Sequence, residues 1–239
     1  MNIALIGYGK MGKLVEQLAP AQGAHVRLKL DEFNNTRFEG ITPDNFRSID
    51  VAIDFSIPDA AVENIGRISA LGVNIVVGTT GWFEQLDRVR CIVEKAGTGL
   101  VWSPNFSIGV NAFSRLVQEA ARLMANESAY EAWAYEIHHS AKKDAPSGTL
   151  WKLVEAMKKA GYSRKIDVSS TRAGAHPGTH EIGFDSAADT ITLRHVARSR
   201  EGFAQGALRA AGWLTGKKGF YEFSEIAFGD QQNPLTADS

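Results

Sequence analysis

The chain is short of cysteine, of surplus charge and of long apolar runs, and each shortage excludes a class of protein. One cysteine, Cys91, among 239 residues excludes an internal disulfide and a multi-thiolate metal cluster. The 26 basic and 27 acidic residues leave no cationic surplus that would attract nucleic acid or an anionic membrane. No stretch approaches the roughly 18 consecutive apolar residues of a membrane-spanning helix.

These shortages define the expected environment. The apolar run Asn2–Ile6 is too short for the apolar region of a signal peptide. We therefore expect a soluble, cytoplasmic protein without nucleic-acid or membrane partners. Cys91 lies in RVRCIVEKA, whose pattern predicts a helix, so we expect it to be a small core side chain. The polar residues 229–239 are expected to be poorly ordered.

The first half of the chain alternates short β-branched runs with helical patterns. The patterns predict strands at 2–6, 25–30, 51–55, 73–77 and 100–102, and helices at 10–18, 59–71 and 83–96. Strands that alternate with helices indicate βαβ units, so the sequence predicts an α/β class with a parallel sheet.

The pattern changes near Pro104. It predicts helices at 111–126, 150–160 and 203–214, and strands at 133–139, 166–170, 180–184 and 190–196. With 44% hydrophobic residues the chain can bury one large core or two small ones, so we expect a second, α+β domain over residues 108–208. The pattern alone leaves open which domain the last helix joins.

The segment Gly7-Tyr8-Gly9-Lys10-Met11-Gly12 has the G-x-G-x-x-G spacing between a predicted strand and a predicted helix. In a dinucleotide-binding loop, Gly7 makes the tight turn and Gly9 lets the backbone approach a pyrophosphate. Gly12 allows close helix–strand packing, and the helix N-terminus attracts the phosphates. The loop therefore predicts a dinucleotide cofactor.

Asp31 ends the next predicted strand, where an acidic residue binds the ribose hydroxyls of such a cofactor. Glu32 follows it, and two carboxylates would repel a 2′-phosphate. The pair favours NADH over NADPH, a preference that Lys10 and Lys29 would soften. A second candidate ligand-binding loop, 78–81 (GTTG), also follows a strand, and an ordinary βα turn is the alternative.

Residues 136–149, EIHHSAKKDAPSGT, concentrate ionisable and hydrogen-bonding groups. His138 and His139 point to opposite faces of a regular strand, so both serve one ligand only where the strand ends or bends. Ser147 or Thr149 can cap the following helix, whose free amides with a histidine and lysines would receive a small dianion. A solvated run of charges is the alternative.

A metal site is the other alternative for this histidine-rich region. His176 and His180 have H-x3-H spacing, but proline and glycine between them exclude one helical face. No cysteine or acidic residue completes an obvious ligand set. We therefore expect no metal.

The same stretch resembles the E-x-HH-x-x-K-x-DAPSGT signature of the 4-hydroxy-tetrahydrodipicolinate reductase (dihydrodipicolinate reductase) family. Further segments are similar to the family's in chain order: GYGKMGK, VAIDFSIPDA, VVGTTGW, SPNFSIGVN, RAGAHPGTHEIGF and HVARSREGFAQGAL. The resemblance implies a Rossmann-type doubly wound parallel sheet, residues 1–107 plus 209–239, to which the last helix returns. It also implies an inserted α+β substrate-binding and oligomerisation domain at 108–208, and a homotetramer.

The activity implied by the resemblance is NADH- or NADPH-dependent reduction of a cyclic imine dicarboxylate, 4-hydroxy-tetrahydrodipicolinate (dihydrodipicolinate), to tetrahydrodipicolinate. The reaction belongs to the diaminopimelate pathway of lysine biosynthesis. By position, His138 is the proton donor and Lys142 a second acid. The implied substrate-binding residues are His139, Ser147, Gly148, Thr149 and Thr80. The implied cofactor-binding residues are Gly7, Tyr8, Gly9, Lys10, Met11, Gly12, Asp31, Gly78, Thr79, Thr80, Ser103, Pro104, Asn105 and Phe106.

The chain departs from the family pattern at three positions, where Trp82, Ser103 and Leu150 replace the usual residues and are expected to reshape the pocket. Two rival functions remain on the sequence. One is another two-domain nicotinamide dehydrogenase, such as an amino-acid dehydrogenase acting on aspartate. The other is a non-enzymatic dinucleotide sensor, which would need no acid–base cluster.

Overall fold

The computed structural model describes residues 1–229 and divides the chain into two compact units. The first comprises Met1–Ile108 and the chain from Glu201, and the second comprises Gly109–Arg200. Nearly all of the polar segment 229–239 lies outside the described residues. Within residues 1–229, no helix has the length and apolar character needed to cross a membrane.

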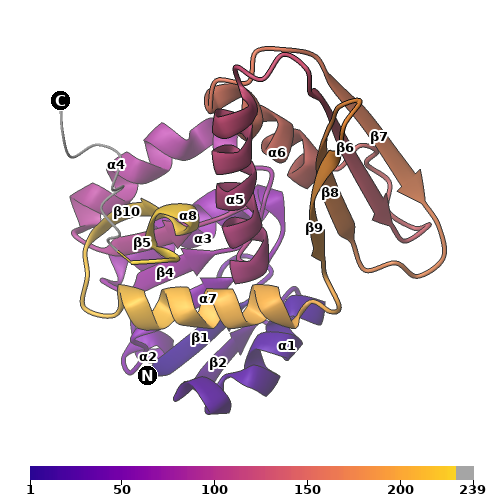
Figure 1. Ribbon diagram of the computed structural model, residues 1–239. Coiled ribbons are helices and arrows are strands. Elements are labelled where there is room, and N and C mark those ends of the chain that lie inside the picture. The colour runs from indigo at the N-terminus through magenta and orange to yellow at the C-terminus, as the bar shows by residue number, and fades with distance from the viewer. Residues whose placement is uncertain (230–239) are drawn as a thin grey trace. The chain divides into compact units, whose positions relative to one another are not determined.

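The first unit is built on a six-stranded, all-parallel sheet (Figure 1). Its order is β10-β5-β4-β3-β1-β2. The strands are β1 (Asn2–Ile6), β2 (His25–Leu30), β3 (Val51–Asp54), β4 (Asn74–Val77), β5 (Gly99–Trp102) and β10 (Gly219–Glu222). The strand order reverses between β1 and β3, which is where open α/β sheets bind ligands.

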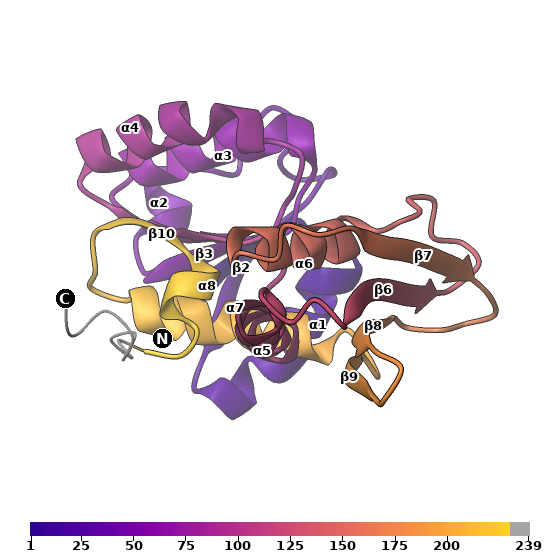
Figure 2. The ribbon, with the colours of Figure 1, turned by 45° about the horizontal axis from the view of Figure 1, so that its top comes forward.

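Helices cover both faces of this sheet (Figure 2). One face carries α1 (Lys10–Leu18) and α7 (Glu201–Leu214), and the other carries α3 (Pro58–Ala70) and α4 (Leu86–Ala96). The short elements are η1 (Pro20–Gln22), α2 (Pro43–Phe46), η2 (Phe83–Gln85) and α8 (Phe223–Ile226).

The two cores follow from the alternation of side chains along each strand. On β1, Ile3 and Leu5 pack in the core beneath α7, whereas Ala4 and Ile6 pack in the core beneath α3. Both faces of the strand are therefore apolar, which explains its uninterrupted hydrophobic run in the sequence.

Helix α7 belongs entirely to the first unit. The expected domain boundary after residue 208 falls inside this helix, whereas the units divide at Arg200. The inner face of the helix is buried against the sheet along its whole length through Ala204, Ala207, Leu208, Ala211 and Leu214.

The expectation that Cys91 is a core residue is wrong, because its side chain is exposed on α4. Val89 and Val93 take the buried face of that helix. The periodicity placed the helix correctly, but the cysteine falls on its outer side.

The second unit pairs helices with a four-stranded mixed sheet of order β7-β6-β8-β9. Strand β6 is parallel to β7 and antiparallel to β8, and β8 is antiparallel to β9. The elements are α5 (Ile108–Met124), β6 (Glu131–His138), α6 (Gly148–Lys159), β7 (Ile166–Arg172), β8 (Thr179–Asp185) and β9 (Thr190–Val196).

One face of this second sheet packs against α5 and α6. Along β6 the row of side chains on that face reads Ala132, Ala134, Glu136 and His138, so it is apolar first and polar afterwards. The polar end of the row lies where β6 ends and the chain turns toward α6. The face of β6 that packs in the core therefore also bears two ionisable side chains, Glu136 and His138, at its C-terminal end.

Candidate active site

Glycine is required at two positions of the loop that follows β1. Gly7 has a φ of +89°, and a Cβ there would lie 2.3 Å from the carbonyl oxygen of Phe55. A Cβ on Gly12 would lie 2.3 Å from the carbonyl oxygen of Gly7. A Cβ on Gly9 would meet no atom within 4 Å, so the backbone there is open to a ligand.

The side chain of Tyr8 ties this loop to the first helix and the second strand. Its hydroxyl donates to the Glu16 carboxylate, which also lies 3.1 Å from Nζ of Lys29. The ammonium of Lys29 lies 4.9 Å from the centre of the Tyr8 ring. The hydrogen bond with Glu16 raises the pKa of Tyr8, so its hydroxyl stays protonated. Lys10 is exposed and Met11 half-buried.

Asp31 lies directly after β2, as the sequence predicts for a ribose-binding carboxylate. Its Oδ1 accepts the backbone N–H of Phe33 at 2.9 Å, and its own N–H donates to Oδ1 of Asn34 at 2.8 Å. This turn fixes the carboxylate at the strand end. Glu32 is exposed beside it.

Asp54 at the end of β3 is a buried anchor that the sequence did not single out as a site residue. Its carboxylate is fully buried and accepts the N–H and Oγ of Ser56 at 2.8 and 2.7 Å. It also accepts Nδ2 of Asn64 at 3.0 Å and Oγ1 of Thr79 at 2.7 Å. Burial raises the pKa of Asp54, while these hydrogen bonds act in the opposite direction.

This anchor decides how the GTTG loop is presented. The hydroxyl of Thr79 is committed to Asp54, whereas Thr80 is exposed. A Cβ on Gly78 would lie 2.1 Å from the Phe55 ring, so only glycine fits the loop's first position. The indole N–H of Trp82 donates to the Thr79 carbonyl at 2.8 Å. This departure from the family pattern is therefore a core residue that steadies the loop.

The segment 103–106 after β5 is held by its own side chains. Oγ of Ser103 donates to the Asn105 carbonyl at 2.8 Å and accepts the Asn105 N–H at 3.1 Å. Phe106 is buried, 4.9 Å from the ring of Phe223, and Pro104 is half-buried. Ser103, a second departure from the family pattern, thus shapes the turn from within.

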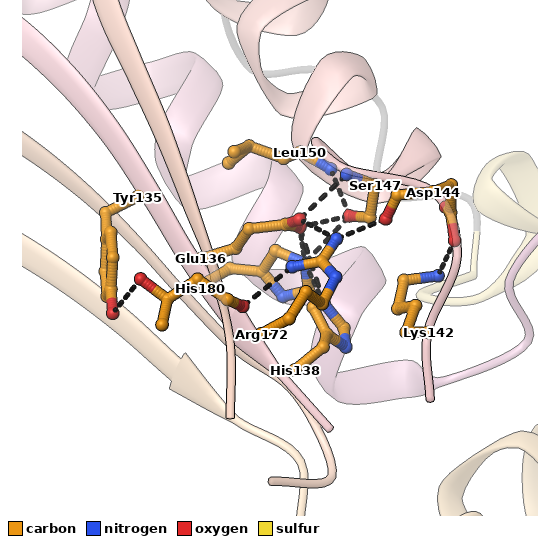
Figure 3. Close-up of polar contacts among 10 residues, drawn as sticks. Tyr135, Glu136, His138, Lys142, Asp144, Ser147, Leu150, Arg172 and His180 are labelled. Carbon is orange, nitrogen blue, oxygen red and sulfur yellow. Dashed lines mark hydrogen bonds and ion pairs between the residues drawn. The ribbon is translucent and has the colours of Figure 1, made fainter. Parts of the chain in front are cut away.

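In the second unit, Glu136 is the centre of a buried polar cluster (Figure 3). Its Oε1 accepts the Ser147 N–H at 2.8 Å and Nη2 of Arg172 at 2.7 Å. Its Oε2 accepts the Ser147 hydroxyl and lies 3.4 Å from Nε2 of both His138 and His180. The Nε2 atoms of the two histidines are also 3.4 Å apart.

Strand register brings these groups together. Glu136 is the antiparallel partner of His180 on β8, and His138 is the parallel partner of Arg172 on β7. Ser147 joins from the N-terminus of α6, where its Oγ accepts the Leu150 N–H at 3.2 Å as the helix cap. Leu150, the third departure from the family pattern, is fully buried in the core.

The electrostatics of the cluster follow from burial and from the guanidinium. Burial acts to raise the pKa of Glu136, but the hydrogen bonds from Ser147 and Arg172 hold it below its usual value. Burial lowers the pKa of His138, which the charge of Glu136 partly counters. Burial and the neighbouring His138 lower the pKa of His180 to about 4, so His180 is neutral near pH 7.

Lys142 lies in the loop between β6 and α6, with its Nζ 2.7 Å from the Asp144 carboxylate (Figure 3). This contact lowers the pKa of Asp144, and the backbone N–H of Gly148 acts in the same direction. Gly148 and Thr149 are the first residues of α6, before the first N–H that the Ser147 hydroxyl caps. The Asp144 carboxylate therefore contacts both Lys142 and the N-terminus of α6.

His139 lies outside the cluster. Strand β6 ends at His138, and the carbonyl of His139 accepts the Lys142 N–H at 3.1 Å to form a turn. Two adjacent histidines can serve one ligand only where the strand ends, and β6 does end between them. His139 is half-buried beside the turn. His176 is exposed whereas His180 is buried, so the H-x3-H pair does not form one site.

The sequence did not assign roles to Glu136, Arg172 and His180. Each lies in a segment quoted above, but the residues that touch are far apart in the sequence. Glu136 and Arg172, for example, are separated by 36 positions. The alternation along β6 could have found Glu136, because Glu136 and His138 alternate with Ile137 and so share one face of the strand. Arg172 and His180 join them through the register of β7 and β8.

Glu136, His138 and His180 place three potential metal-ligating atoms within 4.8 Å of one another. The carboxylate already carries the guanidinium of Arg172 and the hydroxyl of Ser147. A cation there would have to displace or oppose that fixed positive charge. The expectation of no metal stays a prediction.

The first unit has an all-parallel sheet with a glycine loop, and the second is an α+β unit with a buried histidine–carboxylate cluster. These features define a two-domain, nicotinamide-dependent oxidoreductase. Residues 1–106 match the family model for the N-terminus of dihydrodipicolinate reductase, and residues 109–226 match the one for its C-terminus. The chain belongs to the dihydrodipicolinate reductase family.

Individual relatives agree with this assignment. The chain is 36% identical to a 4-hydroxy-tetrahydrodipicolinate reductase of Christiangramia forsetii, covering 95% of this chain and 97% of that one. It is 34% identical to the same enzyme of Archaeoglobus fulgidus, covering 95% and 99%. A dipicolinate-bound dihydrodipicolinate reductase from Paenisporosarcina sp. has the same fold, with a TM-score of 0.79 at 22% identity, covering 95% of this chain and 99% of that one.

The expected fold, a Rossmann-type sheet with a second α+β unit, is confirmed. Family membership makes the protein an NAD(P)H-dependent oxidoreductase of the diaminopimelate route to lysine. It decides against the two rivals, a different nicotinamide dehydrogenase and a non-enzymatic sensor.

Proposed function

We propose that the protein reduces 4-hydroxy-tetrahydrodipicolinate to tetrahydrodipicolinate. One hydride and one proton are taken up and one molecule of water leaves, so the atoms balance. The observation that carries the proposal is the cluster of His138, Glu136 and Ser147 at the start of α6, in a chain of this family. It puts a titratable imidazole and a helix N-terminus within one short segment.

The first unit holds the cofactor in this proposal. NADH or NADPH supplies the hydride when bound. The open backbone at Gly9 and the N-terminus of α1 would hold the pyrophosphate, and Asp31 the adenosine ribose. The loops 78–80 and 103–106 follow β4 and β5 and would position the nicotinamide.

NADH is the proposed preference. Asp31 and Glu32 would accept hydrogen bonds from two ribose hydroxyls and repel a 2′-phosphate. Lys29, which could soften this repulsion, is already paired with Glu16 and lies over the ring of Tyr8. Of the two lysines expected to soften the repulsion, this leaves Lys10, which is exposed.

The second unit holds the substrate dicarboxylate. Lys142 and the first amides of α6, those of Gly148 and Thr149, offer a positive charge and a helix N-terminus, where a substrate carboxylate would compete with Asp144. His139 lies beside the same turn and is proposed as a further ligand. The substrate-binding role of exposed Thr80 stays a prediction. Ser147 acts through its cap and its bond to Glu136, because its hydroxyl is buried and engaged.

His138 is the proposed proton donor. Hydride addition leaves negative charge on the ring-nitrogen side of the substrate, and an acid must neutralise it. Burial lowers the pKa of His138, but two substrate carboxylates nearby would raise it again and favour the imidazolium. Lys142 serves as the second acid and as a fixed charge that orients the ring.

Assembly and location complete the proposal. We propose a homotetramer formed through the second unit, whose sheet face opposite α5 and α6 carries half-buried Trp133 and Tyr135. We also propose that the enzyme works in the cytoplasm. Light scattering on a sizing column would measure the mass of the assembly.

A coupled assay tests the reaction directly. The aldolase of the preceding step generates the unstable substrate in place, and the loss of reduced-nicotinamide absorbance reports turnover. We expect turnover that requires both aldolase substrates. No turnover with either cofactor, or equal turnover with an amino acid such as aspartate in the reverse direction, would contradict the proposal.

A further inference from the structure

The carboxylate of Glu136 connects every element that meets at the polar end of the second sheet. It is wholly buried and contacts its own strand neighbour His138, Arg172 on β7, His180 on β8 and Ser147 at the start of α6. Its two oxygens divide these contacts, with Arg172 on Oε1 and both histidines on Oε2.

We propose that Glu136 is the positioning residue of this active site. It holds Nε2 of His138, so that the proton for the substrate leaves from Nδ1. Through Ser147 it also keeps the first amides of α6 in register with that imidazole. The inference rests on the proposed function, because it specifies how the proposed acid is oriented.

The orientation of the His138 ring carries the first half of this inference. Nε2 lies 3.4 Å from Oε2 of Glu136, an ion-pair distance, and 3.4 Å from Nε2 of His180. Contacts of this kind often tighten once a substrate is bound. Within residues 1–229, Nδ1 of His138 accepts or donates no hydrogen bond. An imidazolium has two N–H groups. The one at Nε2 faces Glu136 and His180, which leaves the one at Nδ1 for the substrate.

A glycine leaves space beside the edge of the ring that carries Nδ1. A Cβ on Gly178 would lie 2.8 Å from Cε1 of His138 and 3.1 Å from Nδ1. Gly178 has a φ of +136°, a conformation that other residues rarely adopt. Any side chain at this position would therefore collide with the His138 ring.

The cost of burying Glu136 supports a functional reason for it. The row on β6 begins with Ala132 and Ala134, and a third apolar residue would continue the core. A buried ion pair such as Glu136 with Arg172 often stabilises a fold no more than apolar side chains of the same size. The carboxylate is therefore better explained by the groups that it orients.

The charges around His138 determine the sign of the test. Glu136 on β6 and Asp144 in the following loop raise the pKa of His138, while Lys142 and Arg172 lower it. His180 on β8 is neutral near pH 7. Removing the Glu136 charge leaves the cations in excess, so the pKa of His138 must fall further.

The decisive variant is Glu136→Gln. We expect kcat to fall by about 10-fold or more, as when the carboxylate behind a catalytic histidine is neutralised. Because the acid must be protonated, the loss of rate at high pH should begin about one pH unit lower. Affinity for NADH should not change. A variant that loses kcat with an unshifted profile would overturn the positioning role.

Two further variants separate the loss of positioning from an unpaired buried charge and from a general effect of removing a carboxylate. Glu136→Gln leaves a buried guanidinium unpaired, so the double variant Glu136→Gln/Arg172→Met removes that charge and should fold while showing the same loss of kcat. Glu181→Gln is the matched control, because Glu181 on β8 pairs with Arg194 at 2.9 Å and does not touch His138. A control as impaired as Glu136→Gln would count against the proposal.

Nuclear magnetic resonance separates this inference from the proposed function. In protein with 15N-labelled histidine, the six histidines give signals that distinguish the two tautomers, and His138→Gln identifies the one sought. We expect neutral His138 to carry its proton on Nε2 and to titrate at lower pH in Glu136→Gln. That result without turnover would support the positioning and refute only the reaction. An Nδ1–H tautomer, or an unchanged titration, would refute the positioning.

Discussion

The hydroxyl of Thr79 donates a 2.7 Å hydrogen bond to the carboxylate of Asp54, which is fully buried at the end of β3. This bond joins the end of β3 to the loop that follows the adjacent strand β4. Asp54 thereby fixes the GTTG loop from the protein interior, where its carboxylate is not exposed to solvent. If the loop binds the cofactor as proposed, that binding would depend on a buried acid at the end of a different strand.

Asp54→Asn should weaken both folding and cofactor binding. The substitution turns one acceptor oxygen into a donor and leaves a buried group unpaired, so we expect a loss of about 1–3 kcal/mol in the free energy of unfolding. We also expect a severalfold higher Kd for NADH. Urea denaturation and fluorescence titration measure the two effects. Asp87→Asn, on the exposed side of α4, is the control and should change neither.

Lys142 and Lys143 should differ sharply although they are adjacent. Lys142 pairs with Asp144 at 2.7 Å beside the start of α6, whereas Lys143 is exposed. We expect Lys142→Ala to lower kcat by about 100-fold, the usual scale for a general acid, and to raise KM for the dicarboxylate. Lys143→Ala should stay within a few-fold of wild type. Equal damage in the two variants would mean that the family motif is misaligned by one residue.

Cofactor preference should follow Asp31 and Glu32. We expect a lower KM for NADH than for NADPH, because two carboxylates oppose a 2′-phosphate. Glu32→Arg should improve the use of NADPH. Steady-state kinetics with both cofactors provide the measurement, and a wild-type enzyme that prefers NADPH tenfold would refute this account.

Pyridine-2,6-dicarboxylate, a planar dianion, should inhibit competitively with the substrate. It would place its carboxylates at Lys142 and the amides of Gly148 and Thr149. A ligand that binds the folded state raises Tm, and we expect a larger rise with NADH present. Lys142→Ala should abolish most of this rise. Absence of inhibition at millimolar concentration would argue against the carboxylate site.

His180 should make the fold sensitive to acid. Its pKa is about 4 in the folded protein against 6.5 for a free histidine, so below pH 6.5 the unfolded chain binds a proton that the folded chain does not. Stability should therefore fall as pH decreases, and His180 should contribute about 2 kcal/mol of the loss between pH 7.5 and 5. Denaturation of His180→Gln at both pH values should show a smaller loss. Exposed His176→Gln should behave as wild type.

The sequence predicted most of the fold because hydrophobic periodicity was strong. The bounds of β1, α1, β2 and β9 agree with their patterns, and elsewhere the ends differ by a few residues. Strand β10 was missed because its four residues, GFYE, follow a glycine- and lysine-rich turn and form a strand only by pairing with β5. Such pairing depends on tertiary contact and leaves no period to detect.

The site was predicted less completely than the fold. Motif residues such as His138, Lys142 and Ser147 could be named from the family signature, but their partners could not. Ser147 was expected to bind substrate, yet its hydroxyl is engaged with Glu136. Arg172 reaches that carboxylate only through the register of β6 and β7, which a sequence does not state.

Strand β10 pairs with β5 in the register Gly219–Gly99, so the first sheet is completed by residues that follow the whole second unit. The glycine loop is synthesised first, but β5 remains an open edge strand until about half of the chain has been added after it. Helix α7, which covers one face of that sheet, is also made late. During synthesis the growing chain therefore exposes an open edge and an apolar face, a form in which proteins aggregate or recruit chaperones. The domain that begins first is the last to be finished.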